Sequence, residues 1–429
     1  MAEQSAYAIL NLRKGVSEQE IKLAYVEMVK RYDPEKHTER FMIIQNAFER
    51  LRDPKKRAKE DVFTYNYPRG EFQFSPEEKT EEPLEEVLGK IKELEQQLVA
   101  NPTDEAVKAA VIPYYFKRSW RHTQKKLWTE AMKDWVLVLQ LDPTNQKAKN
   151  NLLFSYVYLG YYYAVHELVD ESTTLLEKCL RMWPDNLDVI HNLALVADKA
   201  GDKERANKYW SETVKRWKEL LDKAPEDEYL RACIIEVHKH HGGKAMESVP
   251  TAETKQEALE SYREILKFNP ADFEAQYNIV ATLMDERKFE EAIEELKKLQ
   301  QAHPKNLDVV NLLGWAYLNA GKMELAFSTW RRGLVLDPKS HQIKDSIMRA
   351  RLQVGKKLKE GGLYTQALVH FKELQKMMPN QWELHYEIGD TLCRKGDRRS
   401  ALTEFQRVLE LDPKNKAAKK AMSEIRLRG

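Results

Sequence analysis

The apolar residues of the first 66 positions recur at the spacing of amphipathic helices. Ser17 and Glu20 form a capping box, in which each side chain satisfies an unpaired N–H of the first helical turn. Two apolar stripes follow, separated by Asp33-Pro34: Ile21, Ala24, Tyr25 and Met28, and then Phe41, Ile44, Phe48 and Leu51. Asp53-Pro54 begins a short basic helix, because proline is favoured at the first helical position. The pattern predicts two amphipathic helices that face each other across a proline-containing loop.

From about residue 84 onward the sequence repeats itself. Each repeat contains a small residue, a large apolar or aromatic residue four positions later and usually a proline twelve positions after the small one. The small residues are Ala131, Ser172, Ala206, Ala258, Ala292, Ala326, Ala367 and Ala401. A small residue lets two helices approach, and the large residue one turn later fills the space between them. Upstream small residues, Ala194, Gly314, Gly355 and Gly389, are predicted to make the close contact from each partner helix.

The spacing of the repeat prolines sets the predicted architecture. It is 34 or 41 residues at six places, and seven extra residues rotate an apolar stripe by only ~20°, so a lengthened helix keeps its face. We count about eight helix-turn-helix repeats in residues 112–415. Residues 84–111 are predicted as a capping helix and the entry to the solenoid, 416–429 as a C-terminal capping helix, and 242–254 as an inserted loop. The predicted fold is all-α, with a small helical domain at residues 1–66 followed by an α-solenoid.

Residues 67–83 have the composition of a linker. They combine prolines, a glycine and an acidic cluster, and we find no apolar periodicity in them. With no contact identified across this linker, we expect the N-terminal domain to move relative to the solenoid. Proteases should then cut first in this linker and in residues 242–254.

Composition and charge exclude several classes of protein. The 70 Lys and Arg nearly balance the 68 Asp and Glu, whereas a dedicated nucleic-acid binder would carry a basic excess. The apolar content of 42% is too high for a disordered chain. The three scattered cysteines favour neither a disulfide framework nor a zinc ribbon. The least charged stretch, 151–165, is too short to span a membrane, and the N-terminus lacks a secretory signal. We therefore expect a cytoplasmic protein, or one peripheral to a membrane complex.

The sequence offers little catalytic chemistry. It has no phosphate-binding glycine loop, dinucleotide fingerprint, zinc-protease helix or nucleophile elbow. The one dense histidine group is His238-Lys239-His240-His241, where His238 and His241 share a helical face. A solvated helix end is a better interpretation of this group than a metal site. We expect no enzyme activity, no catalytic residue, no metal and no cofactor.

The first part of the chain resembles a J domain of the DnaJ family. The matching pieces are Tyr7-Ala8-Ile9-Leu10, EIKLAYVEMVKRYDPEK and FMIIQNAFERLRDPKKRAKED, which cover nearly all of residues 5–61 in order. In that family a His-Pro-Asp tripeptide between the two long helices stimulates ATP hydrolysis by the seventy-kilodalton heat-shock chaperone. Here the three positions are Asp33, Pro34 and Glu35. The resemblance therefore implies the fold, and we predict that the usual stimulation is lost.

The repeats resemble the tetratricopeptide repeat (TPR), in which the first helix of each pair lines a concave groove. By that resemblance, Asn192 and Asn278 fall on the sixth repeat position, whose side chain points into the groove. Asn151 falls there approximately, and Asn311 is one position early. Asparagine offers a donor and an acceptor, so a row of them can hold the backbone of an extended peptide without reading its sequence. The alternative, that asparagine is simply common at this position, stays open.

The first two predicted repeats are dense in aromatic residues. The consecutive Tyr161, Tyr162 and Tyr163 span about 200° of a helix, so they cannot all face the core. At least one should be exposed, as a hot spot for a partner protein. Ordinary packing is the alternative for most of the remaining aromatic residues.

Two functional hypotheses follow. The first is a non-enzymatic interaction scaffold or assembly factor, which holds one or more partner proteins through extended segments and keeps the J-like domain as a docking module. The second is an active co-chaperone that delivers clients to the heat-shock chaperone and stimulates its ATPase. Asp33 in place of histidine favours the first. Neither hypothesis includes a nucleic acid or a membrane span.

Overall fold

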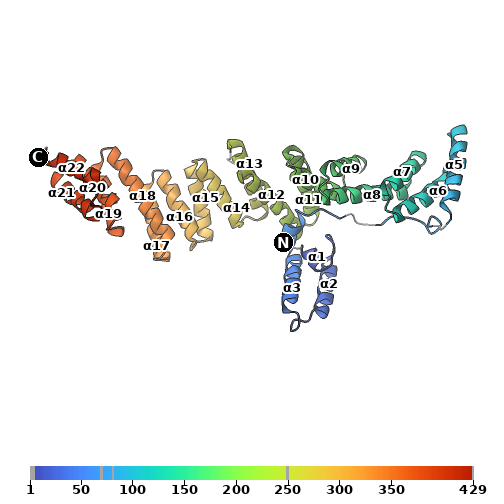
Figure 1. The fold of residues 1–429 in the computed structure, drawn as a ribbon, viewed down its shortest axis with the longest axis horizontal. Coiled ribbons are helices and arrows are strands. Elements are labelled where there is room, and N and C mark those ends of the chain that lie inside the picture. The colour runs from blue at the N-terminus through green and yellow to red at the C-terminus, as the bar shows by residue number, and fades with distance from the viewer. Residues whose placement is uncertain (1–4, 68–70, 80–81, 248–250, 428–429) are drawn as a thin grey trace. The chain divides into compact units, whose positions relative to one another are not determined.

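A computed structural model of the chain describes residues 5–67, 71–79, 82–247 and 251–427. Within these ranges all regular secondary structure is α-helical, in 22 helices without a strand (Figure 1). The predicted all-α class is therefore confirmed. The chain forms two compact units, residues 1–241 and 242–429, and the division between them falls within α12.

From residue 5 onward the N-terminal domain contains four helices: α1 (Ala6–Ile9), α2 (Glu18–Arg31), α3 (Thr38–Arg52) and α4 (Pro54–Asp61). The predicted capping box begins α2: the Ser17 Oγ accepts the N–H of Glu20 at 3.2 Å, and the Glu20 carboxylate accepts the N–H of Ser17 at 2.7 Å. Asp53, directly before Pro54, caps α4 by accepting the N–H groups of Lys55 and Lys56. Between α2 and α3 the apolar stripes meet, and the rings of Tyr25 and Phe48 stack with centroids 4.1 Å apart.

Among the described residues the repeats are eight consecutive pairs of helices, as the sequence predicts. They are α6 (Glu105–Gln124) and α7 (Trp128–Leu141), α8 (Gln146–Val165) and α9 (Val169–Met182), α10 (Leu187–Ala200) and α11 (Lys203–Lys223), α12 (Glu228–Glu247) and α13 (Ala252–Phe268), α14 (Phe273–Asp285) and α15 (Phe289–Ala302), α16 (Leu307–Asn319) and α17 (Met323–Leu336), α18 (His341–Glu360) and α19 (Tyr364–Met377), and α20 (Trp382–Lys395) and α21 (Arg398–Leu411). α5 (Leu84–Ala100) precedes them and α22 (Lys416–Leu427) follows. The three repeats with 41-residue spacing contain the long helices α8, α11 and α18, so the extra residues do lengthen helices.

Small residues bring the two helices of a repeat together at the predicted positions. A Cβ atom placed on Gly355 would lie 2.5 Å from the Phe371 ring, and one on Gly389 would lie 2.9 Å from the Phe405 ring. Gly314 faces Trp330 in the same way. These three aromatic rings are almost completely buried. The large residue therefore fills a space that exists only because its partner has no side chain.

Two predicted boundaries differ from the structure. The boundary between residues 111 and 112 falls inside α6, because Asp104 caps that helix by accepting the N–H groups of Ala106 and Val107. The loop predicted at 242–254 is wrong over its first and last parts: α12 continues to Glu247, and Thr251 caps α13, which begins at Ala252. Helix α12 tolerates Gly242 because the ring of Tyr262 packs against it, 2.7 Å from where a Cβ would be. Residues 248–250 lie outside the described residues.

Candidate functional site

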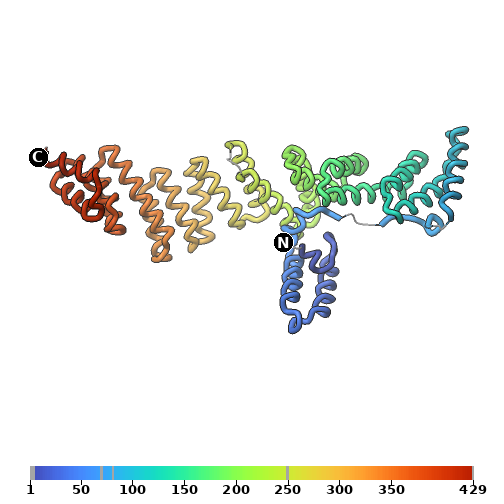
Figure 2. Tube along the Cα trace, viewed as in Figure 1, coloured from blue at the N-terminus to red at the C-terminus, as the bar shows by residue number. Residues whose placement is uncertain are grey.

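The segment that follows α4 lies against the repeats of the first unit (Figure 2). We call its described residues, 62–67 and 71–79, the strap. The strap contains no regular helix or strand, in agreement with a linker composition. It is nevertheless held by hydrogen bonds to α8 and α10. The sequence identifies no contact across this part of the chain, and these hydrogen bonds are the contacts that it does not reveal.

Asn192 on α10 holds the backbone of the strap at Asn66. Its Oδ1 accepts the N–H of Asn66 at 2.7 Å, and its Nδ2 donates to the carbonyl of Asn66 at 3.0 Å. The Asn192 side chain is fully buried, so these two bonds satisfy groups that water cannot reach. The side chain thus binds both backbone groups of one residue, the N–H and the carbonyl of Asn66.

Asn151 on α8, one repeat earlier, makes the same pair of bonds to Gln73. Its Oδ1 accepts the N–H of Gln73 at 2.7 Å, and its Nδ2 donates to the carbonyl of Gln73 at 2.9 Å. Asn151 is also fully buried. We call Asn151 and Asn192 the clamp asparagines, since each binds both backbone groups of one strap residue.

His191 adds a second contact beside the Asn192 clamp. Its Nε2 lies 2.8 Å from the carbonyl of Val62 and its Nδ1 lies 2.9 Å from the Nδ2 of Asn66. A neutral ring with the proton on Nε2 fits both partners, because a carbonyl accepts and an amide nitrogen donates. Burial, together with the charge of Lys14, lowers the pKa of His191 well below its usual value. The imidazole is therefore held in its neutral form.

Aromatic side chains of the strap pack against the repeats on either side of the clamped residues Asn66 and Gln73. Phe63 lies against Trp210 and His240, Tyr67 meets Tyr161 edge to face at 5.2 Å, and Tyr65 is buried beneath the ammonium of Lys199. Burial raises the pKa of Tyr65 to about 12. Further along, Phe72 stacks on Trp128 and Trp135, and Phe74 lies edge to face against Phe116.

The strap ends on an ion pair. Both carboxylate oxygens of Glu78 lie within 3.0 Å of the Lys147 Nζ, on α8, and one of them also accepts the N–H of Ser75 at 2.7 Å. Glu78 is 7% exposed. A carboxylate buried to this extent requires a partner, and Lys147 supplies it from the repeats.

At its other end the strap continues directly from a buried polar junction. The Asp61 Oδ2 accepts the hydroxyl of Tyr7 at 3.0 Å and that of Tyr229, on α12, at 2.7 Å. The guanidinium of Arg57 lies 3.5 Å from the same oxygen. Burial and the Asp61 charge raise the pKa of both tyrosines, so their hydroxyls stay protonated and donate. This junction connects the N-terminal domain to the repeats.

The other two predicted groove asparagines belong to the second unit and behave differently. The Asn278 side chain is half-buried on α14, and no residue in the described part of the chain makes a hydrogen bond to it. Asn311 on α16 accepts the indole N–H of Trp330 through its Oδ1 at 3.1 Å. Its carboxamide is thus bound within its own repeat, which follows from its being one position early.

The three consecutive tyrosines divide as the helical rotation requires. Tyr162 is 45% exposed and packs on the His166 ring, whereas Tyr161 contacts the strap at Tyr67. Tyr163 is half-buried. A partner site on these tyrosines remains a prediction, and Tyr162 is the member that solvent reaches most.

The Asp33-Pro34-Glu35 tripeptide is exposed between α2 and α3. The Asp33 Oδ1 accepts the N–H of Glu35 at 2.8 Å, and the Asp33 carbonyl accepts the N–H of His37 at 2.8 Å. The Asp33 side chain therefore stabilises the turn itself.

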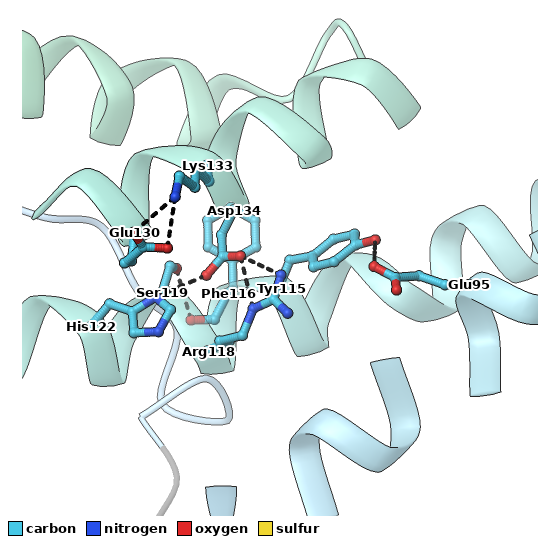
Figure 3. A network of polar contacts seen from close by, with 9 residues as sticks. All are labelled: Glu95, Tyr115, Phe116, Arg118, Ser119, His122, Glu130, Lys133 and Asp134. Carbon is cyan, nitrogen blue, oxygen red and sulfur yellow. Dashed lines mark hydrogen bonds and ion pairs between the residues drawn. The ribbon is translucent and has the colours of Figure 1, made fainter. Parts of the chain in front are cut away.

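A second polar network joins α6 to α7 and includes a serine, a histidine and an aspartate (Figure 3). Arg118 donates twice to the Asp134 Oδ1, at 2.8 and 2.6 Å, and the His122 Nδ1 lies 3.3 Å from the Asp134 Oδ2. The Ser119 hydroxyl donates to the carbonyl of Phe116 and is fully buried. Because a nucleophile must reach both its base and a substrate, this arrangement does not form a catalytic triad. It joins two helices of the first repeat.

One ring of the His238–His241 group is bound to a carboxylate. The His240 Nε2 lies 2.8 Å from the Asp198 carboxylate. Across the ranges that the structure describes, no group of three or more His, Cys, Asp or Glu side chains is arranged to hold a metal ion. Across the same ranges, no helix has both the length and the apolar character needed to cross a bilayer.

Sequence reasoning missed the strap, although a signal is present. Phe63, Tyr65 and Tyr67 alternate with polar residues, and so do Phe72 and Phe74. Alternation with a period of two is typical of an extended segment with one buried face. The prolines and the acidic cluster of this region suggested a solvated linker and obscured the alternation.

The fold and this site define a helical-repeat protein with a J-type N-terminal domain. Residues 5–61 match the DnaJ domain, and residues 253–306, 283–344 and 358–425 match tetratricopeptide repeats. The chain therefore carries an N-terminal DnaJ domain followed by TPR protein-binding repeats.

Curated relatives match a short part of this chain. The chaperone protein DnaJ of Thermosipho africanus is 38% identical over 72 residues, which are 15% of this chain and 19% of that protein. The chaperone protein DnaJ of Thermotoga petrophila is 42% identical over 66 residues, 14% of this chain and 18% of that protein. The chain thus spans about a fifth of the length of these relatives.

Some solved structures match about half of this chain at low similarity. A crystal structure of MamA is 21% identical and covers 42% of this chain and 93% of its own, with a TM-score of 0.32. The structure of YrrB, described as a TPR protein with an unusual peptide-binding site, is 20% identical and covers 49% and 99%, with a TM-score of 0.30.

Proposed function

We propose that this protein is a non-enzymatic scaffold or assembly factor whose TPR groove binds an extended segment of a partner protein. The observation that supports this is the geometry of the clamp asparagines. Each binds both backbone groups of one residue in an extended chain, which is the chemistry by which a groove holds a peptide of any sequence. The groove of the second unit offers the same residue type at Asn278.

The J-like domain is then a docking module that does not give the usual ATPase stimulation. Asp33 supports this, because a carboxylate cannot donate the hydrogen bond that an imidazole can and it repels acidic neighbours. Its engagement in the turn through the N–H of Glu35 points the same way. The DnaJ domain and the tetratricopeptide repeat are families that typically have no enzymatic activity, and the partners we propose are proteins.

Affinity capture with the full chain tests the scaffold, followed by the same capture with Asn278→Ala. Removing one bidentate pair of backbone hydrogen bonds should weaken partner binding by about tenfold or more, since each neutral hydrogen bond contributes about 1 kcal/mol. The matched control is Asn311→Ala, whose carboxamide is bound to Trp330. Unchanged binding by Asn278→Ala would remove Asn278 from the site.

The alternative function is an active co-chaperone. A specific observation keeps it testable: the Asp33–Glu35 turn is exposed and accessible to a partner. In a single-turnover assay we expect the full chain not to accelerate ATP hydrolysis by a seventy-kilodalton heat-shock chaperone. Stimulation equal to that of an ordinary DnaJ protein would establish the alternative.

A further inference from the structure

The second half of the strap occupies two aromatic sockets on the first two repeats. The Phe72 ring lies 5.4 Å from Trp128 and 4.7 Å from Phe154, measured between centroids. The Phe74 ring lies 6.4 Å from both Phe116 and Trp135. The four aromatic residues that form the two sockets lie on α6, α7 and α8.

Between and beyond the sockets the contacts are polar. Asn151 holds both backbone groups of Gln73, whose side chain is exposed except for its bond to Asn150. Four residues after Phe74, Glu78 pairs with Lys147. The position between the two phenylalanines is therefore bound through its backbone, whereas the two rings and the acid are bound through their side chains.

The strap contacts the repeats in the manner of a bound peptide. Its outward positions Glu71, Gln73, Pro76 and Glu77 are exposed, and only one face is covered. A strand in a protein core would be covered on both faces. One covered face, an amide clamp and aromatic anchors in pockets are the features of peptide recognition.

We propose that residues 71–78 are a resident ligand of a peptide site on α6–α8, and that this site selects extended protein segments of the pattern Phe-x-Phe-x-x-x-Glu. A partner segment with this pattern binds when it displaces the resident one. The inference rests on the proposed function, since it names the segment that this part of the groove accepts. It also assigns a role to the strap, which holds the site closed in the absence of such a partner.

The test uses the full chain and a labelled synthetic peptide, EFQFSPEEK, which has the sequence of residues 71–79. A segment tethered nearby has an effective concentration of the order of millimolar, so the unaltered chain should bind this peptide weakly. The double variant Phe72→Ala/Phe74→Ala, with its own ligand impaired, should bind the peptide on the order of a hundredfold more tightly by fluorescence anisotropy. The control peptide EAQASPEEK should not bind the variant.

A charge exchange gives an independent result that leaves both rings in place. The variant Lys147→Glu should prefer the peptide EFQFSPEKK, in which lysine replaces the residue equivalent to Glu78, over the original by about tenfold. This comparison decides the matter even where Phe72→Ala/Phe74→Ala fails to fold, which circular dichroism will reveal.

Three results would overturn the proposal: a folded Phe72→Ala/Phe74→Ala chain that does not bind the peptide, an unaltered chain that binds it equally tightly, or a Lys147→Glu chain without the exchanged preference. None of them depends on a cellular partner. Failure of the resident-ligand proposal is thus distinguishable from failure of the proposed scaffold function. The scaffold function is tested separately, by partner capture with Asn278→Ala.

Discussion

Replacing Asn192 with alanine should release the first half of the strap while the repeats stay folded. The substitution removes two hydrogen bonds, at 2.7 and 3.0 Å, from the backbone of Asn66. Each contributes about 1 kcal/mol net, and each group left unpaired costs a further ~1–3 kcal/mol where water cannot reach it. Because Asn66 is only half-buried, water will replace part of the loss. We take about 2 kcal/mol as the expected change in docking free energy.

Hydrogen exchange of the Asn66 amide measures this change directly, since the protection of an amide reports the free energy of local opening. At ~1.4 kcal/mol per factor of ten, the protection of that amide should fall by about thirtyfold in Asn192→Ala. Amides in the middle of α10 should keep their protection, because the substitution removes no helical hydrogen bond.

Asn278→Ala is the matched control, since it changes the same residue type at the same repeat position without touching the strap. It should leave the Asn66 amide unaffected. The reasoning would be refuted by unchanged Asn66 protection in Asn192→Ala, and equally by a uniform loss of protection throughout α10, which would make Asn192 a folding residue.

Two further predictions concern packing and pH. Gly355→Ala should destabilise the second unit by about 1–3 kcal/mol in denaturant unfolding, because its Cβ would lie 2.5 Å from the Phe371 ring. The control is Gly89→Ala on α5, where an added Cβ would have no neighbouring atom within 4 Å, and this change should leave the free energy of unfolding unchanged or raise it. Strap docking should be full above about pH 6.5 and weaken as the pH falls below it, because the pKa of buried His191 is lowered and the released imidazole takes up the proton first. The resistance of the strap to proteolysis, measured as a function of pH, tests this. In the control His191→Gln the resistance should not fall below pH 6.5. Resistance of the unaltered chain that does not change with pH would contradict the prediction.

Local patterns predicted the helices and their pairing well. The Ser17 capping box, the proline that opens α4 and the small-to-large contact of Gly355 with Phe371 all depend on residues close together in sequence or on a repeated spacing. Such features are decided by backbone hydrogen bonding and side-chain volume within one or two helices. They can therefore be predicted without knowledge of the tertiary arrangement.

The site could be predicted only in part, because its contacts join distant residues. Repeat position singled out Asn192, but nothing local indicates that its ligand is Asn66, 126 residues earlier in the chain. Asn311 lies one repeat position earlier than Asn192 does, and this difference places its carboxamide against Trp330 of its own repeat. The alternating aromatic residues of the strap predict an extended segment, but the surface that covers them comes from four separate repeats.

The strap begins immediately after α4, so no unbound residue separates the N-terminal domain from the part of the strap that the repeats hold. Asp61 ends the helix and binds Tyr229, and the next residue, Val62, is bound by His191. On the proposal of a resident ligand, a partner at about 1 μM competes with a tethered segment at about 1 mM, so it must bind about a thousandfold more tightly than the strap to occupy half of the sites. That factor corresponds to about 4 kcal/mol. A partner that only reproduces the two rings and the acid would not reach it, and must add contacts beyond those that the strap makes.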